Sequence, residues 1–164
     1  MYKAMKALAI VVLIVTIAGA GAVLYGMNTL EPVVEQASVL VTPASQSQDV
    51  FDSVMTQVNK ATFTGRVFAQ PGLQDSGACT FLTYTVRLKN RGFFPAEWVS
   101  LDIQPVEGDL LQLDNVSANV LASGSRGDIN ATVLHQGDAS MTQRNYTINC
   151  YVFGRKMTLQ GTAQ

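Results

Sequence analysis

The sequence predicts an all-β, immunoglobulin-like sandwich of two sheets and seven to eight strands, preceded by an N-terminal transmembrane helix and a short amphipathic helix. Two observations support the sandwich. After Lys60, short runs rich in Val, Thr, Tyr, Phe and Ile alternate with clusters of Gly, Pro, Asn, Asp and Ser, which is typical of strands joined by turns. No pattern between these runs indicates the crossover helices that parallel strands need.

Residues 1–27 form the first predicted segment, an N-terminal signal-anchor or transmembrane helix. From Ala7 to Met27 the chain carries no charge. At ~1.5 Å per residue, a helix of this length spans about 30 Å, the thickness of a bilayer core. Lys3 and Lys6 precede the apolar run, so the positive-inside rule predicts a cytoplasmic N-terminus. We therefore expect a single-pass protein, held in the membrane by residues 7–27, with an extracytoplasmic C-terminal domain.

The same segment also fits a cleaved secretory signal peptide. Residues 20–22, Ala-Gly-Ala, match a cleavage site that would release the domain after Ala22. The apolar run continues through residues 23–25, which favours retention as an anchor. Small residues also recur at four-residue spacing, as in membrane helices that pack against a partner helix: Ala18, Ala22 and Gly26.

Residues 28–47 are predicted to be a linker and residues 48–60 a short helix. The linker is rich in Ser, Thr, Gln and Pro, and Pro32 and Pro43 argue against one continuous helix, although the residues between them fit either a helix or an extended chain. In the second range, apolar side chains fall on one helical face: Val50, Phe51, Val54 and Val58. This face either packs on the core of the next domain or binds a partner.

Residues 61–164 are predicted to form the sandwich. Alternating apolar and polar residues assign one face of several strands to a shared core. The clearest such face lies within residues 80–89: Leu82, Tyr84, Val86 and Leu88. Trp98 falls on the polar side of the next run, opposite Val99.

The range Thr80 to Thr162 resembles the CARDB-type domains, adhesion-related immunoglobulin-like modules of microbial surface proteins. The shared pattern is an alternating strand, an Asn-x-Gly turn, a second alternating strand, a Leu-x-x-Gly turn and two final strands. It is seen in TYTVRLKNRGFFPAEWVSLDI, LASGSRGDINATVL and YTINCYVFG. The resemblance implies a spacer, adhesion module or assembly part without catalytic activity.

Cys79 and Cys150 form a candidate disulfide, because exported domains mature in an oxidising environment. The phase of each strand argues the other way. Cys150 lies on the core face of its run, whereas Cys79 is out of phase with the core face that begins at Leu82. The alternative is two unpaired thiols, one of which fills the core.

Phe93, Phe94 and Trp98 are the candidate binding residues. The two phenylalanines follow a predicted turn, and Trp98 is predicted to point away from the core, so these rings would form an exposed surface for a partner. The alternative is that the short helix or the linker covers them.

Nothing in the sequence predicts a catalytic residue, a metal site or a cofactor. One histidine and two cysteines cannot supply the usual ligands of a structural zinc site, and no GxSxG, HExxH or phosphate-loop motif occurs. A net charge of −1 does not indicate a nucleic-acid partner. We therefore expect a non-catalytic, membrane-anchored extracytoplasmic domain, an accessory or structural subunit of a cell-envelope assembly with an unidentified protein partner. The alternative is a secreted or surface module that binds an external ligand.

Overall fold

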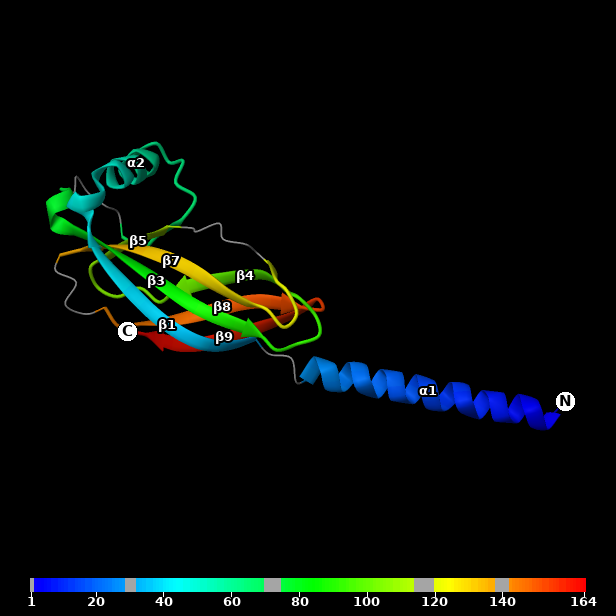
Figure 1. Cartoon of the computed structure of the whole chain (residues 1–164). Coiled ribbons are helices and arrows are strands. Elements are labelled where there is room, and N and C mark those ends of the chain that lie inside the picture. The colour runs from blue at the N-terminus through cyan, green and yellow to red at the C-terminus, as the bar shows by residue number, and fades with distance from the viewer. Residues whose placement is uncertain (1, 29–31, 70–74, 114–119, 138–141) are drawn as a thin grey trace.

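A computed structural model of the protein describes residues 2–28, 32–69, 75–113, 120–137 and 142–164. These residues form two antiparallel sheets and a long N-terminal helix that extends away from them (Figure 1). The predicted immunoglobulin-like, two-sheet sandwich is therefore confirmed.

The N-terminal helix is α1 (Tyr2–Asn28). Its stretch Leu8–Tyr25 has a mean hydropathy of 2.6, and none of it is buried. The hydroxyl of Thr16 donates to the backbone oxygen of Val12 at 2.8 Å, so this polar side chain is satisfied within the helix. By length and composition α1 could cross a membrane, and an N-terminal signal sequence would meet the same criteria.

The two sheets contain nine strands among the described residues. The larger sheet has the order β1-β3-β7-β5-β2 and the smaller one β6-β4-β8-β9. The strands of the larger sheet are β1 (Pro32–Pro43), β2 (Arg66–Val67), β3 (Cys79–Asn90), β5 (Asp109–Leu113) and β7 (Arg126–Gln136). Those of the smaller sheet are β4 (Ala96–Ile103), β6 (Val120–Leu121), β8 (Arg144–Val152) and β9 (Arg155–Ala163).

The main core lies between the sheets and uses the faces that alternation predicts. Tyr84 and Val86 of β3 are fully buried there, together with Ile148 of β8. The two inner faces meet because every second side chain of a strand points to the same side.

The prediction of a linker at residues 28–47 is wrong, because this range contains β1 and the short helix η1 (Ala44–Ser47). β1 is an edge strand that pairs with β3 over its whole length. Proline is tolerated at the ends of such an edge strand, which explains Pro32 and Pro43. The domain therefore begins at Pro32 rather than at residue 61, and residues 29–31 are all that separates it from α1.

A β-bulge explains why β1 does not read as a strand in the sequence. The register shifts between Val34 and Gln36. Val34 packs on the core, and after the bulge Ala37 and Val39 do so as well. The extra residue reverses the phase, so no uninterrupted period of two runs along the strand.

The predicted helix at 48–60 is α2 (Gln48–Asn59). It lies over the outer face of the larger sheet, at the end of the domain remote from α1 (Figure 1). Phe51 and Val54 are buried in a second core with residues of β3, β5 and β7, namely Phe81, Leu110, Leu111 and Leu134. The apolar face of this helix therefore packs on the domain.

Candidate functional site

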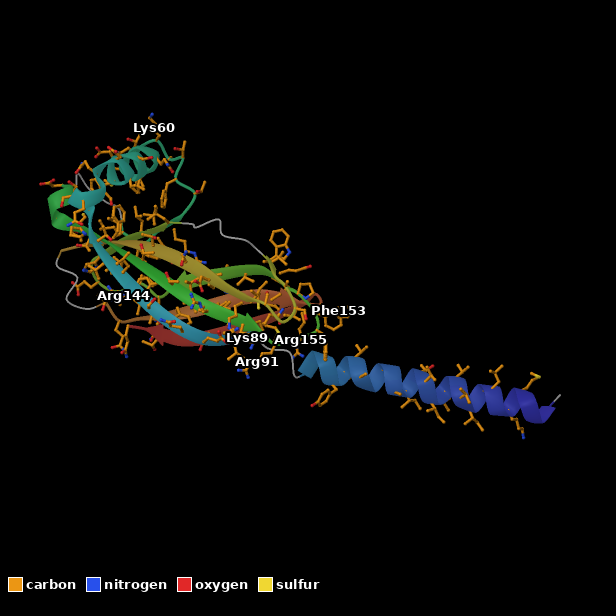
Figure 2. The ribbon with its side chains drawn as sticks, viewed as in Figure 1. Lys60, Lys89, Arg91, Arg144, Phe153 and Arg155 are labelled. Carbon is orange, nitrogen blue, oxygen red and sulfur yellow. The ribbon has the colours of Figure 1, made fainter. Side chains whose placement is uncertain are left out.

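Three turns meet at one end of the sandwich, which we call the α1-proximal end because β1 begins there. Pro32 pairs with Asn90, the last residue of β3, and Ala96, the first residue of β4, pairs with Val152. This register brings together the turns at residues 91–95, 122–125 and 153–154. Figure 2 shows Arg91, Phe153 and Arg155 at this end.

Asn90 holds the turn at residues 91–95 in place. Its side chain is fully buried, and its amide nitrogen donates to the backbone oxygens of Phe94 at 2.8 Å and Leu121 at 3.0 Å. Its amide oxygen accepts from the backbone nitrogen of Gly92 at 2.9 Å. The hydroxyl of Ser123 donates to the oxygen of the same glycine and so ties this turn to the turn at residues 122–125.

The three predicted binding residues lie in this region, and two of them present their rings to solvent. Phe93 is 80% exposed and Trp98 is 68% exposed. Phe94 turns inward, packs against the main core, and has its ring centroid 4.8 Å from that of Phe153. Because α2 lies at the opposite end, the alternative that the short helix covers these aromatic residues is wrong.

Phe153 is a further exposed aromatic residue at this end, and the sequence analysis missed it. It is 60% exposed and forms the tip of the β8–β9 hairpin with Gly154. The sequence feature that could have revealed its exposure is a Phe-Gly pair, a two-residue turn between two alternating runs.

Trp98 and Phe153 share an unusual backbone conformation. Their φ angles are +53° and +51°, and Ala61 is the only other non-glycine residue with a positive φ in the described part of the chain. This conformation costs a residue other than glycine about 1–2 kcal/mol. Trp98 lies in a β-bulge of β4, between Glu97 and Ser100, which turns its side chain outward. Phe153 and Gly154, both with positive φ, form the two-residue turn of the β8–β9 hairpin, whereas Trp98 adopts this conformation inside a strand.

Basic side chains lie at the same end of the domain as the exposed aromatic residues. The described residues include four at this end for which no ion pair or hydrogen bond is found: Lys89, Arg91, Arg155 and Lys156. Of the acidic residues described nearby, Glu97 is likewise unpaired. The α1-proximal end therefore carries an excess of positive charge.

The other charges nearby are neutralised in cross-strand pairs. Arg126 contacts Glu35 at 2.7 Å, and Arg87 contacts Asp128 at 2.7 Å. The hydrogen bond from Arg126 lowers the pKa of Glu35, and the positive charges of Lys89 and other nearby basic residues lower it further. The pairs occupy both charged residues of the Arg126-Gly127-Asp128 sequence.

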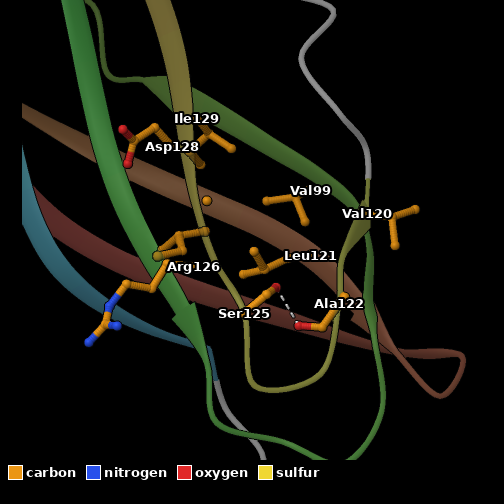
Figure 3. A pocket seen from close by; sticks show the side chains of 10 residues that line it. Val99, Val120, Leu121, Ala122, Ser125, Arg126, Asp128 and Ile129 are labelled. Carbon is orange, nitrogen blue, oxygen red and sulfur yellow. Dashed lines mark hydrogen bonds between the residues drawn. The ribbon is translucent and has the colours of Figure 1, made fainter.

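A small cavity of about 270 Å³ opens beside the turn at residues 122–125 (Figure 3). Its floor is apolar, with side chains from β3, β4, β6 and β7, namely Leu88, Val99, Leu121 and Ile129. The hydroxyl of Ser125 donates to the backbone oxygen of Ala122 at 2.7 Å. The polar groups at the rim are thus engaged within the protein, and the described lining provides no group poised for chemistry.

A buried charged cluster lies at the opposite end. Asp109 accepts from Arg144 at 3.2 Å and contacts His135 Nδ1 at 2.9 Å, and its other oxygen accepts from the backbone nitrogen of Val106 at 2.9 Å. The side chains of Asp109 and Arg144 are 0% and 1% exposed. We interpret this cluster as a structural link between the strands. No group of His, Cys, Asp or Glu suited to a metal ion occurs among the described residues.

The candidate disulfide between Cys79 and Cys150 is wrong, because both are unpaired, buried thiols. Cys79 faces the second core beneath α2, and Cys150 faces the main core between the sheets. Burial raises the pKa of both thiols. The phase difference noted in the sequence has this physical basis: the two side chains lie on opposite faces of the larger sheet.

No family model matches the chain, and no curated protein matches it. Two solved structures have a similar arrangement. The GAE domain of yeast GGA1 is 21% identical, with a TM-score of 0.38 over 55% of this chain and 93% of that one. The GAE domain of GGA2p from Saccharomyces cerevisiae is 11% identical, with a TM-score of 0.39 over 57% of this chain and 95% of that one. Similarity at this level carries no argument about the function of this chain.

Proposed function

We propose that the protein is a non-catalytic extracytoplasmic domain that α1 anchors in a membrane, and that it acts as an accessory or structural subunit of a cell-envelope assembly. The observation that carries this proposal is the 18-residue apolar stretch Leu8–Tyr25, of which none is buried by the domain. In water, a contiguous apolar surface of this kind would drive association. A bilayer would solvate it, and a helix satisfies all its backbone hydrogen bonds within one segment.

The orientation of the proposed anchor follows from charge. Lys3 and Lys6 precede the apolar stretch, and charges close to the ends of a membrane helix set its direction. The domain would therefore lie outside the cytoplasm.

A role in assembly is supported by the exposed aromatic residues. Phe93 and Trp98 present large aromatic surfaces to solvent, and such exposed rings often mark a binding surface. The resemblance to CARDB-type modules supports the same proposal.

The first test is extraction of native membranes with alkaline carbonate, followed by intact mass analysis of the protein. We expect the protein in the membrane pellet with residues 1–27 still attached. Recovery in the supernatant with Val23 as the first residue would refute the anchor. External protease should remove the domain from intact cells, or from spheroplasts where a wall protects it, and protection there would refute the orientation.

Cross-linking mass spectrometry on the same membranes tests the assembly role. Reproducible cross-links from Lys60, an exposed lysine at the end of the domain remote from α1, to a particular neighbouring protein are expected. Their complete absence from native membranes, with efficient cross-links within the domain itself, would argue against a stable assembly.

The second candidate function is a released module that binds an external ligand. The observation that favours it is the Ala-Gly-Ala pattern at residues 20–22, which suits cleavage by a signal peptidase. An N-terminus at Val23 in the carbonate experiment would favour this function.

A further inference from the structure

The distance between α1 and the sandwich is limited by the length of the chain. α1 ends at Asn28 and β1 begins at Pro32, four residue steps later. An extended chain covers at most ~3.6 Å per residue, so these two residues lie within about 14 Å of each other in any orientation of the domain. If α1 spans a bilayer, the α1-proximal end must therefore lie close to the lipid headgroups.

We propose that the α1-proximal end docks on anionic lipid headgroups of the membrane that holds its own α1. The aromatic residues that would reach the headgroup level are Phe93, Trp98 and Phe153. The basic residues that would contact lipid phosphates are Lys89, Arg91, Arg155 and Lys156. This inference rests on the proposed function, because it requires α1 to remain in the bilayer.

The aromatic residues fit the interface between water and lipid. Trp side chains are enriched there because the ring is apolar while its indole N–H still finds a polar partner. Phe93 and Phe153 are apolar side chains on adjacent turns of the same end, at 80% and 60% exposure. Trp98 retains its outward direction at the expense of a left-handed backbone, which an external partner for its ring would explain.

The charges fit an anionic surface. Among the described residues of this end, four basic residues have no ion pair, and Glu97 is the unpaired acidic residue. Glu31 lies outside the described residues. Polybasic surfaces close to a membrane are attracted to anionic lipids. Lys89, the basic residue of this set nearest to α1 in sequence, lies 61 positions after Asn28 (89 − 28). Lys89 and the other three basic residues therefore lie too far along the chain from α1 to set the direction in which α1 inserts into the membrane.

Trp98 provides the measurement, because it is the single tryptophan of the chain. The full chain is reconstituted into vesicles of phosphatidylcholine, with or without phosphatidylglycerol, that carry lipids brominated near the headgroup. We expect Trp98 fluorescence to be quenched in the anionic vesicles and to recover in high salt, which shortens the screening length. Flotation of the vesicles in the same samples reports whether α1 is inserted.

Two sets of variants separate charge from aromatic contact. Arg155→Gln should reduce the ratio of docked to undocked protein about fivefold in anionic vesicles, since a basic residue near such a surface contributes to binding by that factor. Lys60→Gln is the matched control, because Lys60 is an exposed cation at the remote end. Phe93→Ser should also reduce quenching, and Val50→Ser on α2 should not.

The outcomes are distinct. Quenching that requires anionic lipid and Arg155 supports the inference. Flotation without quenching in either lipid overturns it but leaves the proposed anchor intact, as does quenching that is equal in both lipids or unchanged by Arg155→Gln. Failure to float refutes the proposed anchor and the inference with it. Burial of Trp98 only in native membranes, with cross-links from Lys156 to a protein, would make this surface a protein-binding site and overturn lipid docking.

Discussion

Replacement of Asn90 by alanine should loosen the turn that presents Phe93 while leaving both sheets in place. Asn90 makes three hydrogen bonds with its side chain, to backbone groups of Gly92, Phe94 and Leu121. The Asn90→Ala variant removes all three at once. The freed groups belong to the turn at residues 91–95 and to Leu121, the last residue of β6, so this amide would no longer tie the turn to β6.

The magnitude follows from the number of bonds. Each contributes about 1 kcal/mol net, so Asn90→Ala should lower the free energy of unfolding by about 3 kcal/mol. Domains of this size have a total of about 5–15 kcal/mol, so the variant should still fold. With a denaturant slope of about 2 kcal/mol/M in urea, the midpoint should fall by about 1.5 M. Asn90→Asp should be at least as destabilised, because a carboxylate keeps the acceptor for Gly92 but loses both donors.

Urea titration followed by circular dichroism measures the change. Asn130→Ala is the matched control, since Asn130 lies on β7 and its amide oxygen is buried without a hydrogen-bond partner. Its replacement should change the free energy of unfolding by about 0.5 kcal/mol or less. If Asn90→Ala unfolds at the same urea concentration as the unchanged protein, the bonds of Asn90 do not hold the turn and the reasoning fails.

Three further predictions concern the buried groups. Desolvation raises the pKa of Tyr84 to about 12, so its contribution to stability is complete below its ordinary pKa of about 10 and is lost as the pH rises toward 12. Between pH 10 and 12 the free energy of unfolding should therefore fall by about 3 kcal/mol more in the unchanged protein than in Tyr84→Phe. Parallel curves of unfolding free energy against pH for the two proteins would contradict this. Asp109→Asn leaves the charge of Arg144 buried without its counter-ion and should cost about 3–5 kcal/mol in urea denaturation, whereas a loss below ~1 kcal/mol would show that the pair is not important for stability. Cys79 and Cys150 should resist Ellman's reagent in the folded protein, while both should react in guanidinium without a reductant. Absence of reaction in guanidinium would show that the two cysteines are joined in a disulfide.

The sequence predicts those helices and strands along which the spacing of apolar residues is uninterrupted. β3 alternates without a break, so its buried face from Leu82 onward and the opposite phase of Cys79 could both be predicted. α2 has apolar residues at helical spacing, and Phe51 and Val54 are buried as this spacing requires. β1 could not be recognised because a bulge close to its start reverses the phase, and the pairing with β3 that stabilises it is not local in the sequence.

The candidate site was predicted only in part for a similar reason. Phe93 and Trp98 could be identified because one follows a turn and the other falls on the polar side of a strand. Phe94 could not be told from Phe93, since its inward direction is set by contacts with Phe153 and the core. The role of Asn90 and the clustering of basic residues depend on strand ends that are distant in sequence and meet only through the register of the sheets.

The attachment of α1 to β1 has a mechanical consequence. The chain enters β1 at Pro32, and the strand runs from there to Pro43 at the remote end, paired with β3 throughout. The hydrogen bonds of an antiparallel ladder are perpendicular to the strands, so a pull between the membrane and the remote end loads them in shear. All bonds of the ladder then share the force together. If α1 were instead joined to the Pro43 end of β1, a pull on α1 would separate β1 from β3 by breaking their hydrogen bonds one at a time. The observed connection is thus the one that lets an edge strand bear tension.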